Sequence, residues 1–189
     1  MDHPGDLDGV VLTGYSHESP PEYSELALPL IYPANFDPLF AGQFPNMDYL
    51  TLVPGGRSQL FFHEPATSPQ VIALDNGMRD VIAVGELSVV PLIPSPRSLA
   101  IDVPVFIILG DQDLPFCGPG TGYCASEDAL LSFEEDFFSD AACLEVELVE
   151  GVGHNLQLHR KAGSITSQIL NWVNRRVGRD PGAASQACD

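Results

Sequence analysis

The sequence has 189 residues, of which 44% are hydrophobic, and its formal net charge is −18. A chain of this length and composition can bury the core of one ordinary domain, which excludes wholesale disorder. The excess of negative charge repels phosphate backbones and anionic lipid surfaces, so we expect neither nucleic acid nor a membrane as a partner.

The N-terminal residues predict no targeting segment. Residues 1–6 lack the basic and apolar regions of a signal peptide, and no apolar stretch reaches the ~18 residues needed to span a bilayer. Cytoplasmic localisation is therefore the default expectation, although a truncated start would have removed any signal.

The first predicted element is the apolar, β-branched run Gly9–Thr13, which is bounded by Gly14 and typical of a buried parallel strand. The chain enters this strand almost at once, so nothing precedes it that could pair with it. An unpaired sheet edge here would favour self-association. We assign residues 1–18 to this first core strand and the loop that follows.

Residues 19–98 have a different character, with recurrent prolines, scattered aromatics and no clean helical period. Short helices are expected near Glu22–Ala27, Gln70–Leu74 and Met78–Glu86. A structureless connection of this length is rare in a compact domain. We therefore interpret the segment as an irregular, partly helical cap over another element, with an ordinary irregular connection as the alternative.

Residues 99–178 predict the C-terminal core, and residues 179–189 a flexible tail. An unbroken apolar run between Pro104 and Gly110 fits a central strand buried on both faces. In chain order the predicted elements are the strand Val105–Leu109, the helix Ser126–Phe138, the edge strand Cys143–Val149 and the helix Ser164–Val177. This alternation predicts an α/β fold with parallel strands and crossover helices.

Asp113 and His154 are the candidate catalytic residues. Each lies just past one of the predicted strands, and reactive groups gather outside the C-terminal ends of parallel strands. A histidine that acts as general base needs one fixed tautomer and a partner for its charged form, and a carboxylate supplies both. The glycines Gly151 and Gly153 would allow a sharp turn that projects the ring.

These motifs resemble the α/β-hydrolase fold family. Val103–Asp113 looks like the family's penultimate strand and acid turn, Glu150–His154 resembles its histidine loop, and Asp8–Gly14 is similar to the strand after its nucleophile helix. The region from Tyr49 to Phe62 is reminiscent of fungal members. The resemblance covers only the second half of the family's domain, and it implies that Asp113 is the acid and His154 the base of a catalytic triad.

The sequence departs from the family at the nucleophile. The expected G-x-S-x-G elbow is absent, and the first strands of the family would precede Met1. Ser16 follows a strand in the right chain order, but Glu18 replaces the second glycine. Pro20 and Pro21 follow where the elbow demands a helix. We interpret Ser16 as a loop serine beside the cap.

Other polar motifs predict no cofactor and no metal site. Gly118–Gly122 lacks the lysine of a phosphate-binding loop, so we interpret it as a turn. The cysteines have no zinc-ligand spacing. Cys117 and Cys124 could close a small disulfide loop or remain free thiols. The remaining histidines (His3, His17, His63 and His159) are expected to be solvated or structural. Arg175 and Arg176 are expected to complement a helix dipole.

Two functional hypotheses follow. The first is a protein derived from a serine hydrolase that acts on a small apolar ester or amide, incomplete without an N-terminal half that supplies the nucleophile. The capped, aromatic middle region suggests a hydrophobic pocket for such a small-molecule substrate. The alternative is a non-catalytic fragment or a degenerate binding or interaction module.

Overall fold

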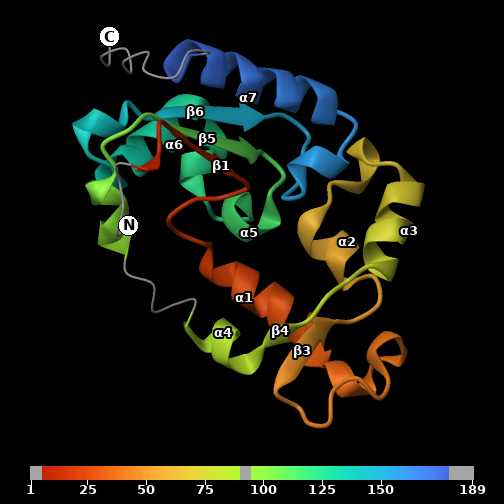
Figure 1. The fold of residues 1–189 in the computed structure, drawn as a ribbon. Helices are drawn as coiled ribbons and strands as arrows, with labels where there is room; N and C mark the ends of the chain where they lie inside the picture. Colours follow the sequence, from red (N-terminus) through yellow and green to blue (C-terminus); the bar gives the residue numbers. More distant parts are fainter. Residues whose placement is uncertain (1–5, 90–94, 179–189) are drawn as a thin grey trace.

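The computed structural model describes residues 6–89 and 95–178 (Figure 1). Its core contains three parallel strands, β1 (Val10–Thr13), β5 (Val105–Gly110) and β6 (Glu145–Val149), in the order β1-β5-β6. The predicted tail 179–189 and His3 lie outside the described residues.

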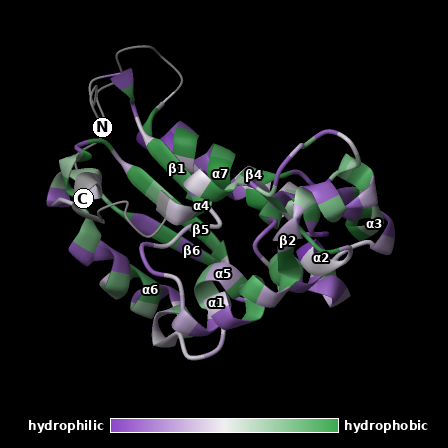
Figure 2. Cartoon of the chain, turned by 90° about the horizontal axis from the view of Figure 1, so that it is seen from below, coloured by the Kyte–Doolittle hydropathy of each residue, from purple (hydrophilic) through white to green (hydrophobic). Residues whose placement is uncertain are grey.

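Strand β5 is buried along its whole length because helices cover both faces of the sheet. Phe106 and Ile108 pack with α7 (Ala162–Arg176) through Trp172 and Ile165. Val105, Ile107 and Leu109 face the other way and pack with Leu130 of α6 (Glu127–Glu134). This alternation follows from the two-residue period of a strand. In Figures 1 and 2, α7 and α6 lie on opposite sides of the sheet, and α6 carries both hydrophobic and hydrophilic colours.

The sequence prediction of an α/β fold with parallel strands and helices is confirmed for this core. Ser126 caps α6 as expected, since its hydroxyl accepts a hydrogen bond from the Ala129 amide. One expectation was wrong: strand β1 is half-buried at the edge of the described sheet rather than fully buried. Arg175 and Arg176 lie in the last turn of α7, as expected, and both also pair with Glu145 of β6.

The segment after β5 contains the short helix α5 (Leu114–Cys117) and a disulfide between Cys117 and Cys124. Of the two alternatives for these cysteines, the structure contains the disulfide. It closes the loop that holds Gly118–Gly122. Within that loop Thr121 bonds back to the carbonyl of Gly118, so this segment is the predicted turn.

The region between β1 and β5 is more regular than predicted. It contains an antiparallel sheet in the order β2-β3-β4, because β2 and β4 both pair with β3. The strands are β2 (Ile31–Pro33), β3 (Tyr49–Leu52) and β4 (Ile82–Ala83), and the helices are α1 (Pro21–Ala27), α2 (Gly56–Phe61), α3 (Pro69–Gly77) and α4 (Val84–Val89). Short 3-10 turns over 28–30, 34–36, 38–40, 64–66, 95–100, 122–125, 135–137, 140–142 and 156–158 connect these elements and those of the core.

Two of the three helices predicted in this region are confirmed, as α1 and α3. The helix predicted over Met78–Glu86 is wrong. The carbonyl of Asp80 accepts a hydrogen bond from the buried hydroxyl of Thr51 in β3, and Ile82–Ala83 pairs with β3 as a strand. Tertiary pairing overrides local helical propensity there, and α4 begins only at Val84.

A buried ion pair joins strand β2 and the turn that follows it to the segment before β4. The carboxylate of Asp37 is fully buried and bound by Arg79, with the Arg79 Nη2 atom 2.5 Å from Asp37 Oδ2. Tyr32 and the amide of Leu39 also donate hydrogen bonds to the carboxylate. Burial alone would raise the pKa of Asp37. The hydrogen bonds from Arg79, Tyr32 and Leu39 outweigh it, so the pKa lies below its usual value.

Candidate functional site

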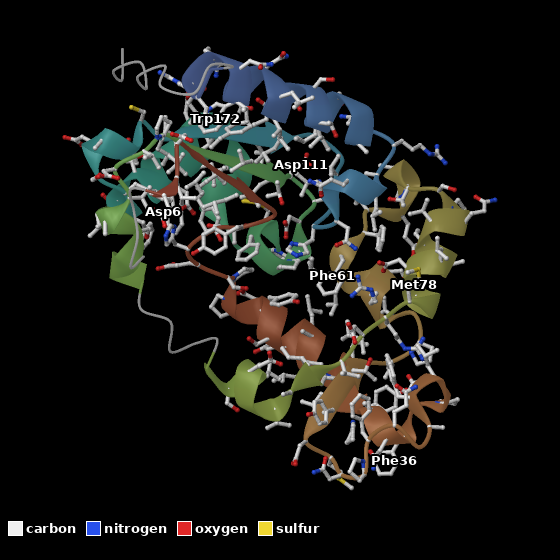
Figure 3. All side chains as sticks on the ribbon, viewed as in Figure 1. Asp6, Phe36, Phe61, Met78, Asp111 and Trp172 are labelled. Carbon is white, nitrogen blue, oxygen red and sulfur yellow. A yellow bond between two sulfur atoms is a disulfide. The ribbon has the colours of Figure 1, made fainter. Side chains whose placement is uncertain are left out.

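Besides the contact of Asp113 with His154, three hydrogen bonds join the loops after β5 and β6. The amide of Asp111 donates to the Val149 carbonyl at 3.1 Å, and the amide of Gln112 donates to the Val152 carbonyl at 3.0 Å. The Asp111 carboxylate in turn accepts from the Gly151 amide at 2.6 Å. This pairing fixes one loop against the other at the carboxyl edge of the sheet, where Asp111 lies in Figure 3.

Asp113 is fully buried at the start of α5. One carboxylate oxygen, Oδ1, accepts the Phe116 amide at 3.2 Å and thereby caps the helix. The other oxygen, Oδ2, lies 3.0 Å from His154 Nδ1. The carboxylate is therefore oriented by the backbone on one side and directed at the imidazole on the other.

His154 lies in the loop after β6, and 28% of its side chain is exposed. Since the carboxylate of Asp113 can only accept, Nδ1 carries the proton of the neutral ring. Nε2 is then the nitrogen that can accept a proton from a reacting group. The structure thus brings together the two residues that the sequence singled out.

Glycines make room for this arrangement. Gly14, at the end of β1, has a φ of +59° and lies against the His154 ring, where an added Cβ would stand 3.2 Å from Nδ1. A Cβ on Gly110 would lie 1.9 Å from the Val152 carbonyl oxygen, so any other residue would separate the two loops. Of the two glycines that the sequence analysis named, Gly151 has a φ of +69°, and Gly153 instead permits close approach to His63.

Two aromatic rings flank the imidazole of His154. The ring centroid of Phe61, in α2, lies 5.3 Å away, and that of Phe116, in α5, lies 6.0 Å away. Figure 3 shows Phe61 on the side of α2 that faces the core. The guanidinium of Arg57 lies 5.2 Å from the Phe61 centroid and also pairs with Asp75. His154 therefore lies between two aromatic rings, one of which carries a charged guanidinium on its face.

His159 fastens the region around α2 to the histidine loop. It is buried, and its Nε2 accepts the amides of His63 and Gly153, each at 3.0 Å. Its Nδ1 faces the Asn155 carbonyl at 2.9 Å, so the neutral ring donates there. Burial lowers the pKa of His159 and favours this neutral form. Of the two expected roles of His159, solvated or structural, the structure contains the structural one.

Burial and nearby carboxylates raise the pKa values of two tyrosines close to the site. Burial, and then the charge of Asp113, raise the pKa of Tyr23 in α1. Burial and the charges of Glu134, Glu18 and Asp113, partly offset by a hydrogen bond with Ser16, raise the pKa of Tyr123 to about 12. Both phenols therefore remain protonated at neutral pH and can only act as neutral hydrogen-bonding groups.

Ser16 does not join this site. Its hydroxyl donates to Glu134 Oε1 at 2.5 Å, and the side chain is buried. Within residues 6–89 and 95–178, Asp113 is the side chain to which His154 is hydrogen-bonded. Ser16 lies in the loop after β1, as expected of a loop serine, and its bonded partner belongs to α6 of the core.

Three residues that contribute to the site were not among the predicted site residues. Asp111, Gly14 and Phe61 shape the loop or flank the ring, but only Asp111 had a visible signal, because it lies in the same turn as Asp113. In the described part of the chain no group of three potential metal ligands gathers, and none of its helices is long and apolar enough to cross a membrane.

Compared with known proteins, the chain matches no protein-family model and no curated protein. The site is therefore interpreted from its own geometry. An imidazole that is partly exposed, oriented by a carboxylate and flanked by two aromatic rings can accept and return a proton beside a small organic molecule.

Proposed function

We propose that Asp113 and His154 are the acid and base of a hydrolase of the α/β-hydrolase type, acting on a small apolar ester or amide. The proposal rests on one observation, the 3.0 Å contact between His154 Nδ1 and Asp113 Oδ2 at the carboxyl ends of two adjacent parallel strands. That contact leaves Nε2 as the basic nitrogen, which is the division of roles in a serine-hydrolase triad.

The proposed mechanism needs a nucleophile from outside the described residues, supplied by an N-terminal half or by a partner chain. His154 Nε2 would take the proton of that nucleophile as it attacks the acyl carbon, and would return the proton to the leaving group. The buried Asp113 carboxylate would stabilise the imidazolium formed between these two steps. Phe61 and Phe116 would favour an apolar acyl group next to the ring.

The proposal is tested on the protein recovered from its own cells through a C-terminal tag, so that any preceding residues or partner chains are retained. Hydrolysis of p-nitrophenyl acyl esters is measured. His154→Ala should abolish the part of the reaction that this pair catalyses, and Asp113→Asn should slow that part about 10⁴-fold, as loss of the triad carboxylate does elsewhere.

The matched control is Asp102→Asn, which changes an exposed aspartate just before β5 and should leave the rate unchanged. Equal rates in His154→Ala and wild type would contradict the proposal. No hydrolysis by the wild-type protein would instead favour the second candidate, a binding module. The engagement of Ser16 by Glu134, away from His154, is the observation that favours this alternative.

A further inference from the structure

A second carboxylate–imidazole pair lies inside the molecule, where the region of α1–α4 joins the core. His17 follows β1, and its Nδ1 lies 2.6 Å from Glu134 Oε2 at the end of α6. Its other ring nitrogen, Nε2, lies 2.7 Å from the hydroxyl oxygen of Ser98. Ser98 belongs to the 3-10 turn Ser95–Ala100, through which the chain returns to the core.

These contacts form a continuous relay from a hydroxyl through an imidazole to a carboxylate. Burial increases along it, since Ser98 is half-buried, the His17 side chain is 4% exposed and the Glu134 side chain is 0% exposed. This is the order that a serine nucleophile, its base and its orienting acid require. Such triads are recognised by geometry and roles rather than by sequence position.

The imidazole is held in place by its surroundings. The Phe137 ring stacks on it at 4.4 Å with an interplanar angle of 2°, and the rings of Tyr15 and Phe138 pack against it at 5.3 and 5.1 Å. A ring fixed in this way keeps Nε2 directed at Ser98.

The carboxylate is held just as firmly. Besides the His17 ring, Glu134 Oε1 accepts the Ser16 hydroxyl at 2.5 Å and the backbone amide of His17 at 3.1 Å. An ionised carboxylate can only accept hydrogen bonds. Nδ1 of the neutral His17 ring therefore donates to Glu134, and Nε2 is left as the acceptor for the Ser98 hydroxyl.

Ser98 itself is anchored from the C-terminal side. The amide of Ile101 donates to the Ser98 carbonyl at 3.0 Å, and the carbonyl of Ile101 accepts the Ser139 hydroxyl at 2.9 Å. Ile101 is part of the hydrophobic core. The serine is thus attached to a rigid element while remaining half-exposed.

We infer that Ser98, His17 and Glu134 form a serine-based acyl-transfer site, separate from the pair of Asp113 and His154. The ligand class is a small activated ester that reaches Ser98 from the surface. Ser98 Oγ would bond to the acyl carbon while its proton moves to His17 Nε2. The ester C–O bond then breaks, and the departing alcohol takes that proton. Water would release the acid in a second, equivalent step and restore the serine.

The test uses the whole 189-residue chain and a fluorophosphonate probe. Ser98 Oγ would bond to phosphorus, the P–F bond would break, and fluoride would leave with the proton from His17. Mass spectrometry of the digested chain should place the label on the peptide that contains Ser98. Ser98→Ala should lose the label. Ser167→Ala, which changes an exposed serine bonded only to the Gly163 carbonyl, should keep it.

A thiol variant gives a second readout that does not depend on the probe. An imidazole next to a thiol favours the thiolate. Each unit by which the thiol pKa falls therefore speeds alkylation by iodoacetamide at pH 6 about tenfold. Ser98→Cys should accordingly react at least about tenfold faster than Ser167→Cys. An unlabelled wild-type chain, equal labelling of Ser98→Ala, or equal alkylation rates of the two cysteine variants would each overturn the inference.

Discussion

The two carboxylate–imidazole pairs use the same chemistry in different surroundings. Each joins an imidazole Nδ1 to a carboxylate that is 0% exposed, at 3.0 Å for His154–Asp113 and 2.6 Å for His17–Glu134. The His154 ring is 28% exposed, whereas the His17 ring is 4% exposed, stacks on Phe137 and contacts two further aromatic rings edge-on. The exposed His154 ring can therefore contact a substrate directly, and removal of its carboxylate should lower the free energy of unfolding only moderately. In the second pair both groups are buried, so each supplies the other with a hydrogen bond that water would otherwise provide.

Removing Glu134 should have the largest effect on stability. Glu134→Ala leaves the ring of His17 and the hydroxyl of Ser16 buried without their acceptor, which should lower the free energy of unfolding by about 3–5 kcal/mol. Urea denaturation measures this change. Asp136→Ala removes an exposed carboxylate two residues away and should change stability by less than about 0.5 kcal/mol. Equal losses of stability in Glu134→Ala and Asp136→Ala would show that the fold does not depend on the buried pair of His17 and Glu134.

Removing Asp113 should cost less. Asp113→Ala leaves the Phe116 amide without its cap, whereas the half-exposed His154 ring can turn to water. We expect a loss of about 1–3 kcal/mol by the same denaturation measurement. A loss as large as that of Glu134→Ala would show that exposure of the ring does not decide the cost.

The buried His159, which joins the region around α2 to the histidine loop, should make the free energy of unfolding depend on pH. Its folded-state pKa lies below the ordinary value of about 6.5, so the unfolded chain binds the proton more readily. The stabilising contribution is therefore complete above pH 6.5 and is lost as the pH falls towards the lowered folded pKa. Urea midpoints from pH 7.5 down to 5 should fall in wild type and fall less in His159→Gln. An identical slope in the variant would assign the dependence to another group.

The smallest effect is expected at the surface of α7. Arg175→Ala removes one of two arginines that pair with Glu145, and its side chain is 52% exposed. Exposed pairs contribute about 0.2–1 kcal/mol, and salt screens them. The difference from wild type in thermal denaturation should therefore shrink further at 1 M NaCl. A salt-independent loss would indicate that packing of the arginine stem against the sheet dominates.

Much of the core could be predicted because its signals are local. The run Val105–Leu109 is apolar without interruption, and a strand covered on both faces requires that pattern. Asp113 and His154 each lie a few residues past such a strand, and parallel pairing places the ends of β5 and β6 side by side. Strand order and loop position were therefore enough to expect their contact.

The rest depended on contacts between residues far apart in the chain. The short strands β2, β3 and β4 have weak patterns of their own, and Met78–Glu86 was predicted as a helix because its pairing with β3 is not visible locally. The relay of Ser98, His17 and Glu134 joins residues from three separate segments. In the sequence, each of them has the pattern of an ordinary loop or helix residue.

The sequence by itself determined the α/β alternation, the buried central strand, the glycines that tighten the loops, and the placement of Asp113 and His154 at neighbouring strand ends. These features follow from side-chain period, backbone freedom and strand polarity, all of which act over a few residues. Only the tertiary structure decided that His17 meets Glu134 and which of the two imidazole rings remains exposed. Burial and pairing of charged groups depend on every element that packs around them, and these contacts cannot be predicted from a local sequence pattern.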